Sequence, residues 1–222
     1  MPDYPILLKL KDRLCLVIGG GPVAVRKARG LLEAGARVRL IASDLAVTVE
    51  ALAGVEVLIR PYRSGDLEGA CLAFAATDDR LVNAAVVREA RQRGVLVNVV
   101  DAPDEGDFTL PALLRRGDLT VSVSTAGGSP ALASVLRDRL AEQMGPEWAT
   151  VLEIVAALRQ KQLTFQGKTE YNQPILRRLL EGGLPVQIAS GDAAAVDRLL
   201  LTLFGEGCSL EQLGIRLVKG MT

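Results

Sequence analysis

A run of three glycines, Gly19 to Gly21, between an apolar segment and a helix-period segment constrains the fold of this chain more than any other feature. Leu14–Ile18 before the glycines has the composition of a buried strand, and Val23–Glu33 after them has the periodicity of an amphipathic helix. Together with Ala24, the glycines fit the G-x-G-x-x-G/A pattern of a dinucleotide-binding turn. In such a turn the helix N-terminus presents free N–H groups and a partial positive charge to a diphosphate.

Each position in this pattern has a physical task. We expect Gly19 to allow a tight turn, Gly21 to let the backbone approach a pyrophosphate, and Ala24 to let helix and strand pack closely. The alternative is an ordinary flexible turn of an α/β protein. That alternative does not account for the second apolar strand, Val38–Ala42, which follows the helix in register.

An acidic residue follows the second strand at the position where a ribose-binding carboxylate is expected. Asp44 lies 20 residues after Ala24 and two residues beyond Ala42. The alternatives for Asp44 are a solvated loop acid and the N-cap of a helix over Leu45–Leu52. No arginine follows closely to hold a 2′-phosphate, so the pattern favours NAD over NADP.

Strands and helices alternate through the rest of the first half, which predicts a parallel, doubly wound sheet. The expected elements are three further strands and one amphipathic helix that ends at Gly94: Val55–Ile59, Cys71–Ala76, Val95–Val100 and Leu81–Arg93. In such sheets ligands bind at the carboxyl ends of strands. Thr77 and Asp101 each come directly after a predicted strand, so both are candidate site residues.

The pattern changes in the second half. Leu119–Ser124 alternates as a strand, and the following segment Thr125–Pro130 leads into a helix over Ala131–Glu142. Gly127 and Gly128 give an anion access to that helix N-terminus, although a capped turn explains them equally well. Three further helices and no other strand are expected after them: Trp148–Gln162, Gln173–Glu181 and Ala193–Phe204. The predicted domains are a Rossmann domain over 1–113, a middle segment over 114–145 and a helical domain over 146–222.

Composition excludes several classes of function. Lys plus Arg and Asp plus Glu both number 26, so no overall field attracts nucleic acid. The chain has no histidine, which excludes a Ser-His-Asp triad and leaves Asp, Glu, Lys, Tyr, Cys or water as the general acid or base. Cys15, Cys71 and Cys208 lack metal-ligand spacing and read as core residues, so no metal site is expected. Without a signal peptide or an apolar stretch of about 20 residues, the prediction is a cytoplasmic protein without a membrane partner.

Six motifs follow one another along residues 4 to about 145. They are Tyr4-Pro5-Ile6 with Lys11-Asp12-Arg13; Val17-Ile-Gly-Gly-Gly-Pro-Val-Ala24 with Arg26-Lys27-Ala28; Ala75-Ala-Thr-Asp-Asp79; Asn98-Val-Val-Asp101; Phe108-Thr-Leu-Pro111; and Val123-Ser-Thr-Ala-Gly-Gly-Ser-Pro130. In this order they resemble the motifs of the precorrin-2 dehydrogenase and sirohydrochlorin ferrochelatase family, the N-terminal module of siroheme synthase. The helical tail agrees with that family in character.

The resemblance implies a reaction, a cofactor and an assembly. The reaction is the oxidation of precorrin-2 to sirohydrochlorin with NAD as acceptor, and some members also insert ferrous iron. The assembly is a homodimer of protomers with an NAD domain, a dimerisation segment and a helical domain. The resemblance also places NAD contacts at Pro22-Val23 and at Ser43-Asp44, and it gives Asp101 a catalytic role.

Reasoning from the residues supports one of these roles. Asp101 follows a strand that should end beside the nicotinamide, where a partly buried carboxylate with a raised pKa would accept a substrate proton. The alternative is a loop acid that caps the next turn. At Ala126 the family usually has glycine, so the family pattern does not determine the backbone conformation at Thr125.

Substrate contacts and two competing functions complete the expectations. The substrate carries carboxylates, and the hypothesis is that they are held by the start of the Ala131 helix and by arginines: Thr125, Gly127, Gly128, Arg115 and Arg116. A solvated face is the alternative for the arginines.

The first alternative function is an NAD-sensing regulatory module without catalysis, and the second is a Rossmann dehydrogenase for another anionic small molecule.

Overall fold

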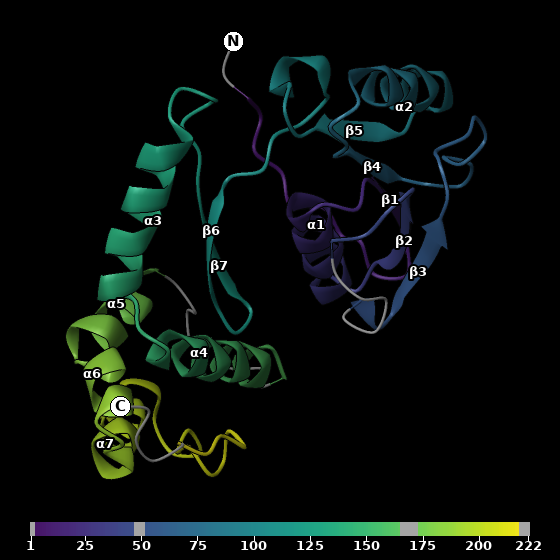
Figure 1. The fold of residues 1–222 in the computed structure, drawn as a ribbon. Coiled ribbons are helices and arrows are strands. Elements are labelled where there is room, and N and C mark those ends of the chain that lie inside the picture. Colours follow the sequence, from purple (N-terminus) through teal and green to yellow (C-terminus); the bar gives the residue numbers. More distant parts are fainter. Residues whose placement is uncertain (1–2, 47–51, 165–172, 218–222) are drawn as a thin grey trace. The chain divides into compact units, whose positions relative to one another are not determined.

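The structure is a computed structural model that describes residues 3–46, 52–164 and 173–217. The chain divides into two compact units, Met1–Leu110 and Pro111–Thr222 (Figure 1). Each unit has its own hydrophobic core. The first unit ends three residues before the predicted boundary at 113, and the predicted division of the remainder at 145 stays a prediction.

The first unit is a five-stranded parallel sheet in the order β3-β2-β1-β4-β5. This confirms the doubly wound α/β class predicted from the alternation of elements. Its elements are β1 Leu14–Ile18, α1 Pro22–Glu33, β2 Arg37–Ala42, β3 Val55–Ile59, β4 Leu72–Ala75, α2 Arg80–Arg93, β5 Leu96–Val99 and the short 3₁₀ helix η2 Pro103–Glu105. The strands agree with the predicted ranges to within a residue at each end.

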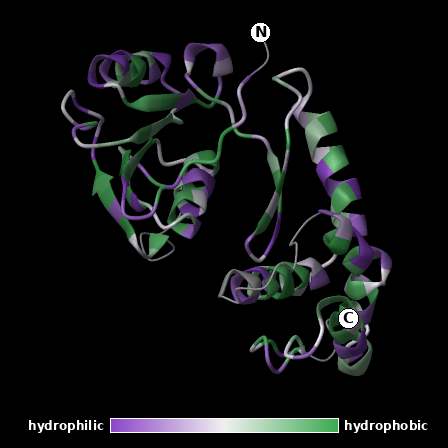
Figure 2. Cartoon of the chain, turned by 180° about the vertical axis from the view of Figure 1, so that it is seen from behind, coloured by the Kyte–Doolittle hydropathy of each residue, from purple (hydrophilic) through white to green (hydrophobic). Residues whose placement is uncertain are grey.

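Alternate residues of the central strands supply two separate cores. Cys15 and Val17 of β1 pack with α1, whereas Leu16 and Ile18 pack with α2 on the opposite face. This alternation explains why the strand is apolar at every position, because a parallel strand covered on both faces buries all of its side chains. Figure 2 shows these strands in the hydrophobic colour.

The cysteines of this unit are core residues, as expected. The Sγ atoms of Cys15 and Cys71 lie 3.8 Å apart, and neither forms a disulfide. Burial, with the neighbouring Cys71, raises the pKa of the Cys15 thiol to about 12. The thiolate is therefore disfavoured, so Cys15 is a poor nucleophile.

The second unit combines a β-hairpin with helices. Its elements are β6 Ala112–Arg116, β7 Leu119–Val123, α3 Pro130–Gln143, α4 Glu147–Thr164, α5 Gln173–Glu181, α6 Leu184–Ala189 and α7 Ala193–Phe204. The antiparallel pair β6–β7 turns at Gly117, whose φ is 55°. Helix α3 packs on one face of the hairpin, and α4 to α7 bury a core that includes Ile154, Leu158 and Leu200.

Two expectations about the second unit are wrong. Ala112–Arg116 is a strand, although the sequence predicted no strand besides Leu119–Ser124. Its pairing with β7 explains this, because Leu114 is buried opposite Val121. In the sequence, Leu113 and the two arginines obscure the alternation of apolar and polar residues that would indicate a strand. Helix α6 was also missed, because Gly182-Gly183 and Pro185 read as a loop, whereas Pro185 lies in its first turn.

The helix predicted over Leu45–Leu52 is described only at its ends. Leu45 and Ala46 are not helical, Leu52 has 3₁₀ conformation, and residues 47–51 lie outside the described part of the chain. The Asp44 side chain accepts a hydrogen bond from the Leu45 amide at 2.8 Å, one residue on. An N-cap at Asp44 would accept from the amide two or three residues on. Of these two amides only that of Ala46 is described, and it donates to the Gly20 carbonyl instead.

Candidate dinucleotide and catalytic site

The candidate site lies at the carboxyl edge of the parallel sheet in the first unit. Strand β1 leads through the glycine turn to α1, and its neighbours β2 and β4 lie on opposite sides of it. The connections therefore diverge at the carboxyl ends of β1 and β4, which is the topological switch point where such sheets bind ligands. Ser43 and Asp44, Thr77, and Asp101 follow β2, β4 and β5 at this same edge.

The three glycines of the turn do different things. Gly19 has a φ of 129°, and a Cβ there would overlap the carbonyl of Ala76, so it allows both the turn and the close approach of the chain after β4. A Cβ on Gly20 would overlap the carbonyl of Asp44. A Cβ on Gly21 would meet no atom within 4 Å, so this glycine faces open space. The sequence pattern predicted the turn at Gly19 but missed the packing role of Gly20.

The N-terminus of α1 has no side-chain cap. Its N-cap is Gly21, with φ of −73° and ψ of 173°, and Pro22 occupies the first turn. Helix α2, in contrast, is capped by Asp79, whose carboxylate accepts hydrogen bonds from the amides of Leu81 and Val82. The first-turn amides of α1 are thus left for another acceptor beside the open space at Gly21, as an anion site requires. Ala24 is fully buried, in agreement with its expected packing role.

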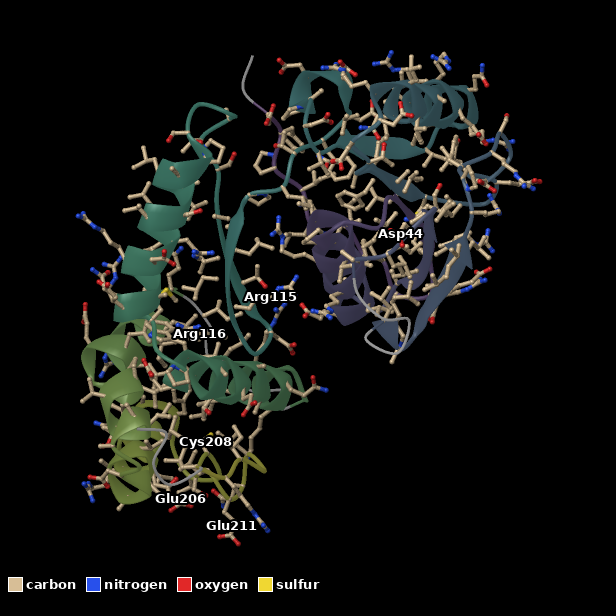
Figure 3. All side chains as sticks on the ribbon, in the orientation of Figure 1. Asp44, Arg115, Arg116, Glu206, Cys208 and Glu211 are labelled. Carbon is tan, nitrogen blue, oxygen red and sulfur yellow. The ribbon has the colours of Figure 1, made fainter. Side chains whose placement is uncertain are left out.

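The segment after β2 lies against the glycine turn. The Ala46 amide donates to the Gly20 carbonyl at 2.8 Å, and the Asp44 carbonyl packs over Gly20. The Ser43 and Asp44 side chains are exposed. Figure 3 labels Asp44 in the first unit. This is the place at which a Rossmann domain presents an acid to a ribose hydroxyl.

A buried amide that the sequence analysis missed connects the ends of β4 and β5. Asn83 of α2 is only 3% exposed, and its Oδ1 accepts hydrogen bonds from the Thr77 hydroxyl at 2.7 Å and the Thr77 amide at 3.3 Å. Its Nδ2 donates to the Thr77 carbonyl at 2.9 Å and to Oδ1 of Asp101 at 3.4 Å. Asn83 therefore connects two residues that the sequence proposed separately. The signal was an amide on the apolar stripe Asn83, Val86, Val87 and Ala90 of α2.

Asp101 itself differs from expectation in one respect. Its side chain is exposed, so the expectation of a partly buried carboxylate is wrong. The reason is local: strand β5 ends at Val99, and Asp101 lies in the bend before η2, where the chain leaves the sheet. The Thr77 hydroxyl lies within hydrogen-bonding distance of two acceptors, Oδ1 of Asn83 at 2.7 Å and the Asp79 carbonyl at 3.0 Å.

A lysine on α1 has an unusual environment near this turn. Lys27 is half-buried, and its Nζ lies 5.7 Å from the centre of the Phe74 ring, which packs edge-on against Phe108. Burial, with a smaller contribution from Arg26, lowers the pKa of Lys27. The cation over the aromatic face is a stabilising contact between α1 and β4.

The candidate substrate residues of the second unit have structural partners. The Thr125 hydroxyl accepts a hydrogen bond from the Ser129 amide at 3.0 Å, and its carbonyl accepts one from the Gly128 amide at 2.9 Å. Between them Ala126 and Gly127 have φ values of 48° and 81°. Ser129 caps α3 by accepting from the Leu132 amide, which supports the capped-turn interpretation of this segment.

The two arginines differ. Arg116 donates to the carbonyls of Met144 at 2.7 Å and Ala141 at 3.3 Å, at the C-terminal end of α3, where cations are favoured. Arg115 is exposed on the other face of the hairpin, opposite Thr120. Figure 3 shows both on the hairpin of the second unit. The geometry gives Arg116 a structural role at the end of α3.

Neither a cluster of metal ligands nor a membrane-crossing helix is present among the described residues. Across residues 3–46, 52–164 and 173–217, no three His, Cys, Asp or Glu side chains gather as metal ligands do. Within the same ranges, no helix combines the length and the apolar character that crossing a bilayer requires.

Comparison with known proteins matches both units. Residues 6–112 match the family described as putative NAD(P)-binding, and residues 116–143 match the family described as sirohaem biosynthesis protein central. Siroheme synthase of Methylococcus capsulatus is 41% identical over 203 residues, which cover 90% of this chain and 43% of that protein. The chain is a relative of the siroheme synthases. The resemblance inferred from the motifs is thereby confirmed, as is a domain of the nicotinamide-dinucleotide-binding type.

Other relatives agree with this result. Siroheme synthase of Pseudomonas aeruginosa is 36% identical, with 90% of this chain and 44% of that protein covered. The present chain thus spans less than half the length of these two siroheme synthases. Among solved structures, SirC, a precorrin-2 dehydrogenase, superimposes with a TM-score of 0.72 over 90% of this chain and 98% of that one, at 22% identity. This likeness shows the shared fold.

Proposed function

We propose that this chain catalyses the NAD-dependent oxidation of precorrin-2 to sirohydrochlorin. Two features at one edge of the sheet carry the proposal: an uncapped helix N-terminus beside Gly21, after β1, and a carboxylate, Asp101, after β5, which lies on the far side of β4. The siroheme synthase relatives and the name of the structural neighbour support the choice of substrate.

The residues present fit a dinucleotide. The amides of Val23 and Ala24 are placed to receive the diphosphate, because Gly21 leaves open space beside them and Pro22 has no N–H of its own. Asp44 and Ser43 would hold the adenosine ribose, and the Asp44 carboxylate would repel the 2′-phosphate of NADP. Thr77 contributes the backbone wall after β4. When bound, NAD supplies the acceptor for the hydride that leaves the substrate.

Asp101 is the proposed general base. The oxidation removes one hydride and one proton from precorrin-2, and it yields sirohydrochlorin, NADH and a proton. Asp101 takes that proton, since the chain has no histidine and this carboxylate follows the strand beside the switch point. Its exposure lets it pass the proton on to water.

In the second unit we propose that Arg115, with the turn at Thr125, Gly127 and Gly128, meets substrate carboxylates. Arg115 lies on the exposed face of the hairpin with the side chains of Thr120, Ser122 and Ser124. An arginine among hydroxyl groups on one face suits the recognition of carboxylates. Because Arg116 holds the end of α3, we do not propose it for this role.

We also propose a homodimer formed through α3. Leu132, Val135 and Leu136 are 49%, 51% and 39% exposed on this helix, which lies within the middle segment 114–145. Neighbouring apolar side chains on one exposed helix face are typical of a protein contact. The free cysteines agree with a cytoplasmic location.

The test of the proposed reaction is spectroscopic. Purified protein is mixed anaerobically with precorrin-2, with and without NAD, and the spectra of sirohydrochlorin and NADH are followed. We expect both products to appear together in equal amounts, and only when NAD is present. Binding of NAD without any oxidation of precorrin-2 would contradict the proposal and favour a sensing module. Adding ferrous iron after completion tests iron insertion in the same sample.

A further inference from the structure

The buried amide of Asn83 carries an inference beyond the proposed reaction. Buried polar side chains are normally satisfied, and Asn83 uses all four of its hydrogen-bonding positions. Three of these hydrogen bonds are made with one residue, Thr77, through its backbone amide, its hydroxyl and its carbonyl, and the fourth is made with Asp101. We infer that Asn83 is a positioning residue that fixes the Asp101 carboxylate relative to the wall of the dinucleotide site.

The orientation of the amide follows from its partners. The Thr77 amide can only donate, so it requires the Oδ1 of Asn83, whereas the Thr77 carbonyl and the Asp101 carboxylate can only accept, so they require Nδ2. The reversed amide would face a donor with a donor and two acceptors with an acceptor. Only a side chain with one acceptor and one two-proton donor satisfies this set, which asparagine provides at this length.

The two ends of the bridge are joined to different parts of the site. Thr77 follows the carbonyl of Ala76, which lies against Gly19 so closely that no Cβ fits there. Asp101 follows β5 and lies exposed in the bend before η2. Asn83 comes from α2, whose N-terminus is capped by Asp79 and whose buried face carries the core residues Val86, Val87 and Ala90. The carboxylate is thus held by a donor on a rigid helix, as the geometry of a catalytic group requires.

The inference rests on the proposed function for its kinetic part, whereas the hydrogen bond itself can be tested without turnover. In the ¹H–¹⁵N spectrum of the whole protein, the side-chain NH₂ pair of Asn83 is identified by its disappearance in Asn83→Asp. We expect this pair to exchange slowly with water and to shift in Asp101→Asn, which weakens the acceptor. An Asn83 NH₂ pair that does not shift in Asp101→Asn would overturn the inference, whether or not the protein turns over.

The kinetic arm compares two buried polar side chains on α2. Asn83→Asp keeps the size but places a second carboxylate against Asp101 and the Thr77 carbonyl. Glu89→Gln alters a side chain that is 6% exposed on the same helix, and its partners are Tyr62, Gly65 and Arg93, away from both site residues. Both substitutions should lower the unfolding temperature.

Only the first should lower kcat at saturating NAD and precorrin-2, by roughly tenfold to a hundredfold, which is the cost of misplacing a catalytic group. Asn83→Gln should also have a lower kcat than the wild-type protein, because the longer glutamine side chain cannot make the same four hydrogen bonds. Equal kcat values for Asn83→Asp and Glu89→Gln would overturn the positioning role. A wild-type protein without turnover would instead refute the proposed function, and the NMR arm would still decide the contact.

Discussion

At the scale of single residues, Gly20 and Gly21 lie in different surroundings although they are adjacent in the glycine turn. Gly20 is required by the protein itself, because the Asp44 carbonyl occupies the place of its Cβ, and Gly21 has open space there. The G-x-G-x-x-A pattern marks only Gly19 and Gly21, so it assigned a role to the glycine beside open space and none to Gly20, which the packing of the chain requires. Gly20 and Asn83 depend on contacts with residues distant in sequence, which a local pattern does not contain.

Alanine at each glycine should therefore have a different effect. Gly20→Ala should lower the free energy of unfolding by at least about 2 kcal/mol, as overpacking does. Gly21→Ala, at a φ of −73°, should keep the stability within about 1 kcal/mol but weaken NAD binding roughly tenfold or more. Urea unfolding and calorimetric titration with NAD measure the two quantities. Unchanged NAD affinity in Gly21→Ala would place the diphosphate elsewhere.

Ala126 carries backbone strain that can be relieved. Its φ of 48° is unfavourable for a residue with a Cβ by about 1–2 kcal/mol, and glycine in the unfolded chain offsets about 0.5–1 kcal/mol of the gain. We expect Ala126→Gly to raise the free energy of unfolding by up to about 1 kcal/mol, and Gly127→Ala, at a φ of 81°, to lower it by a similar amount. Thermal and urea unfolding of both variants check the signs, and a destabilised Ala126→Gly would contradict this account.

At the scale of elements, glycine and proline punctuation made most strands and helices predictable. Helices α2 and α7 were predicted to within one residue, because Asp79 with Gly94 and Asp192 with Gly205 mark their ends. Strand β6 was missed because pairing with β7, rather than its own pattern, makes it a strand. The connection between β3 and β4 gave no signal in sequence, although an ion-pair cluster fixes it in the structure.

This connection should make the first unit sensitive to acid. Arg60 bonds both carboxylate oxygens of Asp66, and this contact lowers the pKa of Asp66 below its ordinary 3.8. Burial opposes ionisation of Glu89, but hydrogen bonds from Tyr62, Gly65 and Arg93 outweigh it and lower the pKa of Glu89 below 4.5. Because both folded-state pKa values are depressed, the stabilisation is present above the ordinary values and is lost as the pH falls through the lowered ones.

The substitution Asp66→Asn should therefore lower stability at neutral pH and flatten its decline in acid. The measurement is the urea midpoint of wild type and variant as a function of pH, with Asp104→Asn, in the same unit, as the matched control. Parallel pH curves for wild type and Asp66→Asn would show that this carboxylate does not contribute to the acid sensitivity.

At the scale of the whole molecule, the family resemblance implied a dimerisation segment, and Leu132, Val135 and Leu136 are substantially exposed on α3. If this face joins two copies, Val135→Asp places an unpaired charge in the contact, at a cost of about 2–5 kcal/mol. The dimer dissociation constant should then rise by roughly a hundredfold or more. Val135→Thr, which keeps the branched shape without a charge, should change it little.

Analytical ultracentrifugation over a concentration series measures both variants. A wild-type chain that sediments as a monomer at all concentrations would refute the proposed dimer. A dimer that Val135→Asp leaves intact would place the contact on another face.

In the proposed complex the carboxyl edge of the parallel sheet binds oxidised NAD with its nicotinamide toward Asp101. A crystal structure of the protein with NAD would show this arrangement. We expect the diphosphate against the amides of Val23 and Ala24, the adenosine ribose at Asp44 and the nicotinamide beside Asp101. A dinucleotide bound away from Gly21, or one whose nicotinamide points away from the end of β5, would contradict it.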